Sequence, residues 1–283
     1  MNRVCCYIFV LSLGFGFSSC TKEVSEVSGC IFAKRANMDL VWDEEFEGSD
    51  LDTLTSWKFF RGDGCPDNCR WGNNESQFYT DTNVYVSDSV LTIFADKQVL
   101  DISSGRITTE GLRNLNSGRI DVRAKLPLQS GIWPFLSIGP TDIPIDSLEA
   151  RLFENAQIDF LALANAANAD IVNQNFSYRD PDTALVTIGS QYQFAEQDSV
   201  DFSEDFHEYS IQWTSDCVRF FVDNNEVAPP LNRSTILPSG WPFDQPLYLT
   251  IGLDVGGNNG EGSVGILTPY PQEFKIDYVK FYQ

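Results

Sequence analysis

The chain has 283 residues, of which 42% are hydrophobic and 13% aromatic, so it can bury a full core. Its formal net charge is −21, which argues against nucleic acid or an anionic membrane surface as a partner. A polyanionic glycan is disfavoured for the same reason. A neutral polysaccharide is indifferent to this charge, which also serves solubility.

Residues 1–19 have the pattern of an export signal, because their apolar run over residues 4–17 is too short for a stop-transfer helix. The run ends in Phe17-Ser18-Ser19-Cys20, which resembles the lipobox of bacterial lipoproteins, where the cysteine is lipidated and becomes the mature first residue. The sequence therefore predicts a signal peptide over 1–19 and a lipidated Cys20 with a polar tether over 20–37. The protein would be an outer-membrane lipoprotein at the cell surface. An ordinary signal peptide cut near the same place is the alternative.

Beyond Cys20 the chain keeps an even number of cysteines, as expected for disulfides in an exported protein. Cys65 and Cys69 flank the turn-forming Pro66-Asp67-Asn68, so we predict a disulfide between them. Cys30 and Cys217 would then join the tether to the domain. Zinc binding by these four cysteines is the less favoured alternative, since the chain has a single histidine.

Residues 38–283 have the pattern of one β-rich domain without internal repeats. Residues 118–126 alternate between apolar and polar side chains, which indicates a strand with one buried face. Residues 208–213 and 218–222 flank a turn at Thr214-Ser215-Asp216, which predicts a hairpin. Residues 275–282 form the last predicted strand. Many short strands of this kind indicate a β-sandwich or barrel.

Several motifs arrive in an order that identifies a family. One is Trp71-Gly72-Asn73-Asn74-Glu75, and another is Gln157-Ile158-Asp159-Phe160-Leu161-Ala162. Further matching stretches are residues 40–46, 104–107, 118–127, 131–134, 206–213, 241–246, 255–257 and 276–283. Together they resemble glycoside hydrolase family 16, the laminarinase and lichenase group. The resemblance implies a concanavalin A-like β-jelly roll of two curved antiparallel sheets with an open cleft.

The family's reaction is retaining hydrolysis of β-glucans, which needs two carboxyl groups about 5–5.5 Å apart. Its members carry Glu-Ile-Asp-(Ile/Phe)-Met-Glu here, so the resemblance places Gln157 at the nucleophile position and Ala162 at the acid/base position. Of the three carboxyl groups in this family motif, only the central one, Asp159, remains. An amide oxygen is a poor nucleophile, and alanine has no proton to give, although acid–base assistance alone is worth about 10²–10⁴ in rate.

The resemblance also implies that a bulge in this strand returns the sixth residue, Ala162, to the face that carries Gln157 and Asp159. Two other positions depart from the family: Ser137 stands where a second tryptophan is usual, and Gly189 where a histidine is usual. The centre of the implied cleft has therefore lost charge, proton carriers and stacking area.

Aromatic and polar residues that could still hold a sugar are carried over from the same motifs. The predicted substrate-binding residues are Trp71, Asn73, Asn74, Glu75, Arg106, Trp133 and Trp241. For the tryptophans, core packing is the alternative. The resemblance places Glu45 and Asp277 at positions that bind a structural calcium ion in many members, and no other cofactor is required. Two surface acids in terminal strands are the alternative there.

Three functions follow as hypotheses. The first is a non-catalytic surface lipoprotein that binds a neutral β-glucan and holds it for partner hydrolases or a glycan-uptake system. The second is a retaining endo-β-glucanase that uses relocated carboxylates, and the third is a structural or adaptor protein whose cleft is empty.

Overall fold

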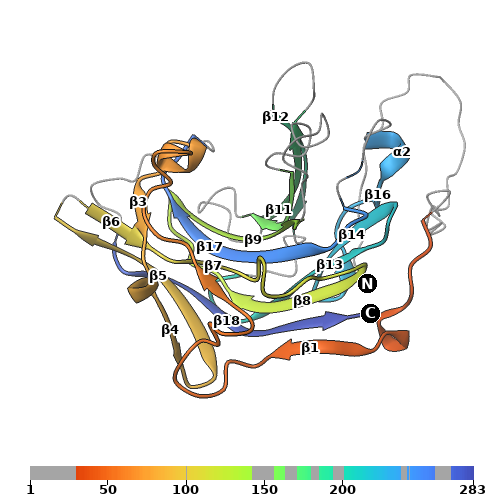
Figure 1. The fold of residues 1–283 in the computed structure, drawn as a ribbon, viewed down its shortest axis with the longest axis horizontal. Coiled ribbons are helices and arrows are strands. Elements are labelled where there is room, and N and C mark those ends of the chain that lie inside the picture. Colours follow the sequence, from red (N-terminus) through yellow and green to blue (C-terminus); the bar gives the residue numbers. More distant parts are fainter. Residues whose placement is uncertain are drawn as a thin grey trace, which may run out of the picture.

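The computed structural model describes residues 30–99, 101–141, 156–162, 171–179, 185–193, 201–236, 241, 243–258 and 269–283. Over these residues the chain forms two curved β-sheets, one lying on the other (Figure 1). The predicted all-β sandwich is confirmed. The predicted signal peptide and Cys20 lie outside the described residues. No helix among the described residues is long and apolar enough to cross a membrane.

The seven-stranded sheet carries the motif strand Gln157–Ala162 near its centre. In the described part of the chain its order is β12-β11-β10-β9-β17-β7-β2, with every neighbouring pair antiparallel. These strands are β12 (Leu185–Gln193), β11 (Ile171–Arg179), β10 (Gln157–Ala162), β9 (Ile132–Pro140), β17 (Leu247–Val255), β7 (Arg106–Thr108) and β2 (Lys58–Phe59).

The second sheet has eleven strands among the described residues and lies beneath the first in Figure 1. Its main path is β15 (Asn225–Glu226), β14 (Cys217–Val222), β13 (His207–Trp213), β8 (Gly118–Lys125), β18 (Gln272–Tyr282), β5 (Val90–Gln98), β6 (Asp101–Ser104) and β3 (Gln77–Tyr79). Three more strands pair beside that path: β1 (Leu40–Glu44) with β18, β16 (Leu231–Asn232) with β14, and β4 (Val84–Ser87) with β5. Short helices are η1 (Arg35–Asn37), η2 (Cys69–Gly72), η3 (Asp81–Asn83) and α2 (Arg233–Ile236).

Alternation of apolar and polar side chains explains which face of each strand is buried. In β8, Ile120, Val122 and Ala124 are fully buried in the core between the sheets, as predicted. The hairpin of β13 and β14 is also confirmed, with Thr214 donating its N–H to the carbonyl of Cys217 at 2.9 Å.

The closing strand β18 departs from simple alternation. A register shift between Ile276 and Tyr278 places Val279, not Tyr278, in the core. The hydroxyl of Tyr278 lies on the other face and donates to Glu208 at 2.7 Å.

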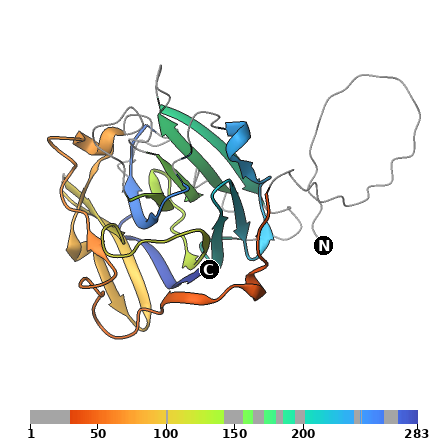
Figure 2. The ribbon, with the colours of Figure 1, turned by 45° about the vertical axis from the view of Figure 1, so that its right-hand side comes forward.

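The segment before the predicted boundary at residue 38 is attached to the second sheet. Cys30 is disulfide-bonded to Cys217 at the start of β14, and Gln212 of β13 donates to the carbonyl of Ala33 at 2.8 Å. Arg35 reaches the fully buried Asp121 of β8, with Nε 2.8 Å from the carboxylate. Figure 2 shows this segment, red to orange, beside β13 and β14. The ordered domain therefore includes residues 30–37, which the sequence assigned to the tether.

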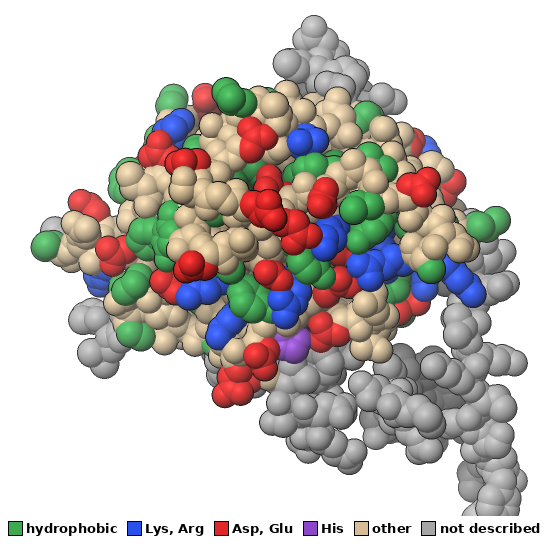
Figure 3. All heavy atoms as spheres, turned by 90° about the horizontal axis from the view of Figure 1, so that it is seen from below, with side chains coloured by type: hydrophobic (Ala, Val, Ile, Leu, Met, Phe, Trp, Pro, Cys, Tyr) green, Lys and Arg blue, Asp and Glu red, His purple; other side chains and the backbone are tan. Residues whose placement is uncertain are grey.

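The outer face of the second sheet mixes charges of both signs. Figure 3 views the molecule from below and shows Asp and Glu side chains interspersed with Lys and Arg. Ion pairs on this face include Lys275 with Glu273 at 2.7 Å and the contact of Arg123 with Asp277. Such exposed pairs contribute little to stability, about 0–1 kcal/mol each.

The two disulfides of the described chain differ in the length of chain that they close. Cys30–Cys217 spans 187 positions and Cys65–Cys69 spans 4. Loop-closure entropy predicts that Cys30→Ser/Cys217→Ser lowers the free energy of unfolding by about 5 kcal/mol, against about 2 kcal/mol for Cys65→Ser/Cys69→Ser. Urea unfolding of both variants beside the native protein measures this, and equal losses would contradict the entropic account.

Candidate functional site

The motif strand β10 is bulged, and the bulge decides which side chains it presents. Asp159 pairs with Asn175 of β11, but the next pair on that side is Ala162 with Asn173. Ile158, Phe160 and Leu161 are all buried in the core, while Gln157, Asp159 and Ala162 are partly exposed. The bulge thus returns Ala162 to the face of Gln157 and Asp159, as predicted. We call this outer face of the seven-stranded sheet the site face.

Strand register aligns the side chains of the site face in rows that cross the strands. One row, from β11 to β7, contains Asn173, Ala162, Phe135, Gly252 and Arg106. Gly252 is required for close approach, because a Cβ there would lie 2.5 Å from the ring of Phe135. The missing side chain lets Phe135 lie across β17 next to Arg106.

The neighbouring row contains Asn175, Asp159, Ser137, Thr250 and Thr108. The hydroxyl groups of Thr250 and Thr108 are 3.2 Å apart, and both residues are buried. This row is polar but has no cation.

Asp159 is held by amides. The side-chain nitrogen of Gln157 donates to Asp159 Oδ1 at 3.0 Å, and Asn175 is also hydrogen-bonded to the carboxyl group. Burial nevertheless raises the pKa of Asp159 to about 7, with a further increase from the charge of Asp254. Gln157 therefore acts on this face as a neutral hydrogen-bond donor to a carboxyl group that is readily protonated.

A second cluster of carboxyl groups lies where β3 meets β17. Glu75 is 6% exposed and accepts a 2.7 Å hydrogen bond from Gln77, whose oxygen accepts from the N–H of Val255 at 2.9 Å. The hydroxyl of Tyr79 donates to Asp254, which is also hydrogen-bonded to Glu75. Two carboxyl groups in direct hydrogen-bond contact share one proton.

The proton resides in this cluster because burial disfavours a second negative charge. Burial, and then the charge of Asp254, raise the pKa of Glu75 to about 8, and burial also raises the pKa of Asp254. Burial works to lower the pKa of Arg106, but nearby Tyr79 and Asp254 outweigh it and raise that pKa. Burial therefore favours a proton on this carboxyl pair over two negative charges, beside the Arg106 guanidinium.

Aromatic rings enclose the Arg106 guanidinium. Its central carbon lies 4.4 Å from the ring centre of Phe60, 5.2 Å from Phe135, 5.6 Å from Trp71 and 5.9 Å from Tyr79. Cation–π attraction of this kind fixes a guanidinium in place. The cage therefore holds Arg106 where the charges of Asp254 and Glu75 act on it.

Four buried polar atoms of the site face have no hydrogen-bond partner among the described residues. They are Trp71 Nε1, Arg106 Nε, Trp133 Nε1 and Asn173 Oδ1. Buried polar atoms normally have partners, so these three donors and one acceptor provide unused capacity for a polar ligand.

Asn73 and Asn74 are also placed beside this cluster. The N–H of Asn258 donates to the carbonyl of Asn73 at 2.9 Å, and Asn74 donates to the Asn258 side chain at 3.4 Å. Gly257 has a φ of 93°, and a Cβ there would meet the Asn73 amide at 2.8 Å. Both asparagines thus join the motif loop to the end of β17.

Trp241 is not on the site face, so the prediction that it binds substrate is wrong. It is 2% exposed, belongs to the core, and stacks on Phe176 with ring centres 5.6 Å apart. Phe243 packs edge-on against both rings. The structure therefore supports the alternative of core packing at this position.

Glu45 and Asp277, the residues predicted to bind calcium, are each paired with a cation in the structure. The carboxylate of Glu45 lies 2.7 Å from Lys280 Nζ, and Asp277 is ion-paired with Arg123. No group of three or more acidic, His or Cys side chains suited to a metal occurs among the described residues. The calcium site at these two residues stays a prediction.

Asp254 is the site residue that the sequence prediction missed. Leu253 and Val255 are fully buried on the opposite face of β17, so Asp254 projects onto the site face across from Trp133. The available signal was a single acid within the apolar stretch Leu247–Val255.

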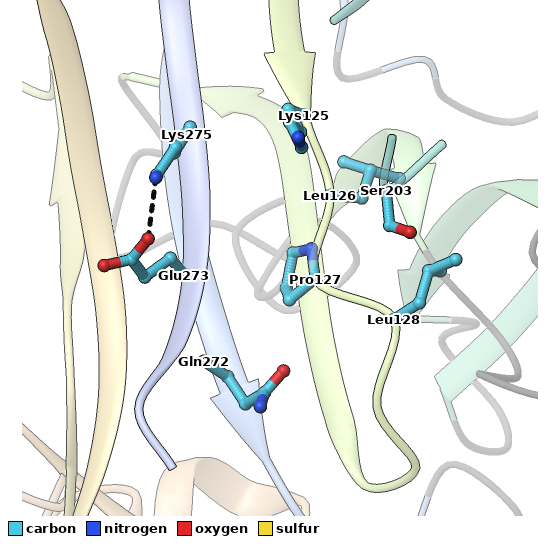
Figure 4. Close-up of a pocket in the computed structure, with 8 residues that line it drawn as sticks. All are labelled: Lys125, Leu126, Pro127, Leu128, Ser203, Gln272, Glu273 and Lys275. Carbon is cyan, nitrogen blue, oxygen red and sulfur yellow. Dashed lines mark ion pairs between the residues drawn. The ribbon is translucent and has the colours of Figure 1, made fainter. Parts of the chain in front are cut away.

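A surface hollow on the second sheet is a weaker candidate. Its lining residues are Lys125, Leu126, Pro127, Leu128, Ser203, Gln272, Glu273 and Lys275 (Figure 4). Lys275 is paired with Glu273, and Lys125 donates to the carbonyl of Glu204 at 2.8 Å. None of the described lining residues is aromatic, so they do not provide the stacking surface of the site face.

A family model described as glycosyl hydrolases family 16 matches residues 68–280. This chain belongs to that family. The chain is 32% identical over 268 residues to glucan endo-1,3-beta-glucosidase A1 of Niallia circulans, covering 88% of this chain but 38% of that longer protein. It is 30% identical to a beta-glucanase of Rhodothermus marinus, covering 97% and 93% of the two chains. The crystal structure of a laminarinase from Flavobacterium sp. UMI-01 is 37% identical, with a TM-score of 0.72 over 87% of this chain and 100% of that one.

The raised pKa of Glu75 predicts a pH-dependent stability. Its pKa is 4.5 in an unperturbed chain and about 8 in the folded protein, so the folded state alone keeps the proton between these values. The free energy of unfolding should therefore fall as pH rises from about 4.5 to about 8. Glu75→Gln cannot titrate and should show a flatter decline in urea unfolding over that interval. The exposed Glu47→Gln is the control, and an unchanged slope in Glu75→Gln would contradict the assignment.

Proposed function

We propose that this family 16 protein is a non-catalytic surface lipoprotein that binds a neutral β-glucan. It would hold the polymer at the outer membrane for partner hydrolases or a glycan-uptake system. The observation that carries this proposal is the pair Gln157 and Ala162, which the bulge of β10 brings to one face beside Asp159.

That pair cannot perform the retaining reaction. A retaining glycosidase needs a carboxylate nucleophile and a carboxylic acid about 5–5.5 Å apart. Gln157 supplies an amide that is already used as a donor to Asp159, and Ala162 supplies a methyl group. Neither the glycosyl ester nor proton transfer to the leaving oxygen is available from them.

Asp159 and Asp254 are poorly placed to replace them as a pair. Asp159 and Asp254 lie on β10 and β17, which β9 separates. They pair with Ser137 and Trp133 on β9, so they are offset along the strands as well. Two strand spacings are about 9.5 Å, and an offset of four residues along a strand is about 13 Å. Each separation is well above the distance of about 5–5.5 Å between the two carboxyl groups of a retaining glycosidase.

Glycan binding, by contrast, needs only aromatic rings and hydrogen-bonding groups, which the site face still has. Sugars are held by aromatic surfaces together with a few hydrogen-bonding groups. Trp71 and Trp133 have indole nitrogens without partners in the described part of the chain, and Arg106 and Asn173 add a donor and an acceptor. The named activities of the relatives, glucan endo-1,3-beta-glucosidase and beta-glucanase, support a β-glucan as the ligand.

Charge supports the choice of a neutral polymer. The net charge of −21 disfavours a sulfated or uronic-acid glycan. The Phe17-Ser18-Ser19-Cys20 motif supports export and lipid anchoring. Acyl-group analysis of the exported protein beside Cys20→Ser tests the anchor separately from glycan binding.

Binding and hydrolysis are tested together with laminarin. Titration calorimetry should show binding, while reducing-end assays of the same mixture should show no release of sugar. Trp71→Ala should weaken binding about tenfold, which is a loss of about 1.4 kcal/mol in binding free energy. Tyr85→Ala, an exposed aromatic of β4 in the other sheet, is the matched control. No binding to laminarin or lichenan would favour the adaptor alternative and overturn the proposal.

Restoring the two carboxyl groups should restore chemistry. We expect Gln157→Glu/Ala162→Glu to release reducing ends from laminarin, because both acid–base and nucleophilic functions return to the bulged strand. Each single variant should stay at least about 100-fold slower than the double variant. Activity in the native protein that depends on Asp159 would instead indicate hydrolysis by relocated carboxylates.

A further inference from the structure

We propose that the Cys65–Cys69 disulfide positions Trp71 on the site face and so sets the affinity for glycan. This inference rests on the proposed function for its ligand, while its structural part stands on the loop itself. The disulfide lies in the segment between β2 and β3 that carries the Trp71-Gly72-Asn73-Asn74-Glu75 motif.

Trp71 reaches its place through an unfavourable backbone. Arg70 and Trp71 have φ values of 53° and 52°, in the left-handed region that non-glycine residues rarely adopt. Gly72, directly after Trp71, and Gly64, earlier in the same loop, have φ values of 71° and 83°. A chain with several such residues does not keep this path unless other contacts hold it.

Both ends of the loop are held by the sheets. Gly62 forms a bridge with Tyr79 at one end, and Glu75 forms a bridge with Gly256 at the other. The N–H of Ser76 also donates to the carbonyl of Val255 at 2.8 Å. The part between these anchors includes the left-handed pair Arg70 and Trp71.

Inside the loop, the disulfide closes the turn directly before Trp71. The N–H of Asn68 donates to the carbonyl of Gly64 at 2.8 Å, and the N–H of Trp71 to that of Asp63 at 3.3 Å. A Cβ on Gly64 would lie 2.2 Å from the Asn68 carbonyl and 3.2 Å from the Trp71 ring, so turn and indole are in close contact. The disulfide therefore fixes the turn against which Trp71 rests.

The environment of the cysteines indicates a conformational role for the bond. Cys65 and Cys69 are both exposed, so their sulfur atoms add little to a core. Cys217 of the other disulfide is fully buried. The bond near Trp71 therefore acts mainly by restricting the loop.

The position of Trp71 matters because the indole completes the Arg106 cage. Its ring centre lies 5.6 Å from Phe60 and 5.1 Å from Tyr79, and Arg106 lies over its face. A loosened loop would let the Trp71 indole leave the Arg106 cage, and the protein would lose the pre-organised ring that a sugar would contact.

The experiment compares the two disulfides in the exported protein by NMR of the indole N–H signals. Trp71→Phe assigns the Trp71 signal. We expect Cys65→Ser/Cys69→Ser to shift or broaden that signal alone and to weaken laminarin binding about tenfold. Cys30→Ser/Cys217→Ser is the matched control and should leave both the Trp71 signal and the affinity unchanged.

Selective reduction provides a second measurement if a serine variant fails to fold. A mild phosphine reductant should open the exposed Cys65–Cys69 bond before the buried one, and alkylation with mass mapping shows which bond is open. An unchanged Trp71 signal after this bond is open would overturn the proposal, as would an altered signal with unchanged laminarin affinity. If the native protein does not bind laminarin, the proposed function fails, while the NMR comparison still decides whether the disulfide positions Trp71.

Discussion

Burial of one face of the seven-stranded sheet determines the whole site face. Leu249, Ile251 and Leu253 have no exposure, so the residues between them must project to the other side. Asp254 is on the site face because Val255 is in the core, rather than because any polar partner attracts it there. The bulge in β10 follows from the same constraint, since the core takes both Phe160 and Leu161.

Electrostatics is the second factor that determines the properties of the site face. The site face places Asp159, Glu75 and Asp254 in a desolvated region where Arg106 is the cation that acts on all three. Protons therefore compensate for the missing positive charge, as the raised pKa values of these carboxyl groups show. An amide at position 157 fits this setting, because it donates a hydrogen bond to Asp159 where a carboxylate would add repulsion. The amide thus stabilises the very residue that the ancestral motif has kept.

Sequence patterns predicted those features that depend on local alternation or on motif order. The sandwich, the β13–β14 hairpin and the bulge of β10 are of this kind. Trp241 was misplaced because a tryptophan in a family motif has the same sequence signal whether it stacks on a ligand or on Phe176. The ion pairs of Glu45 with Lys280 and of Asp277 with Arg123 were not predicted either, because they depend on strand register, which the sequence does not reveal. Asp254 was missed because its importance depends on β3 lying beside the end of β17.

The direction of the rows on the site face bears on the kind of ligand. The row from Asn173 through Ala162, Phe135 and Gly252 to Arg106 crosses five strands, a span of about 19 Å at the usual strand spacing. Ala162 has a small side chain, whereas Phe135, the middle residue of the row, lies over Gly252 toward Arg106. Its ends carry polar groups with unused hydrogen-bonding capacity, Asn173 at one end and Arg106 at the other. A small ligand cannot use both ends at once, whereas an extended chain lying across the strands contacts both. The geometry therefore favours a polymer, and it places the fixed residues of the sheet under the chain and Trp71, on its cross-linked loop, at the Arg106 end.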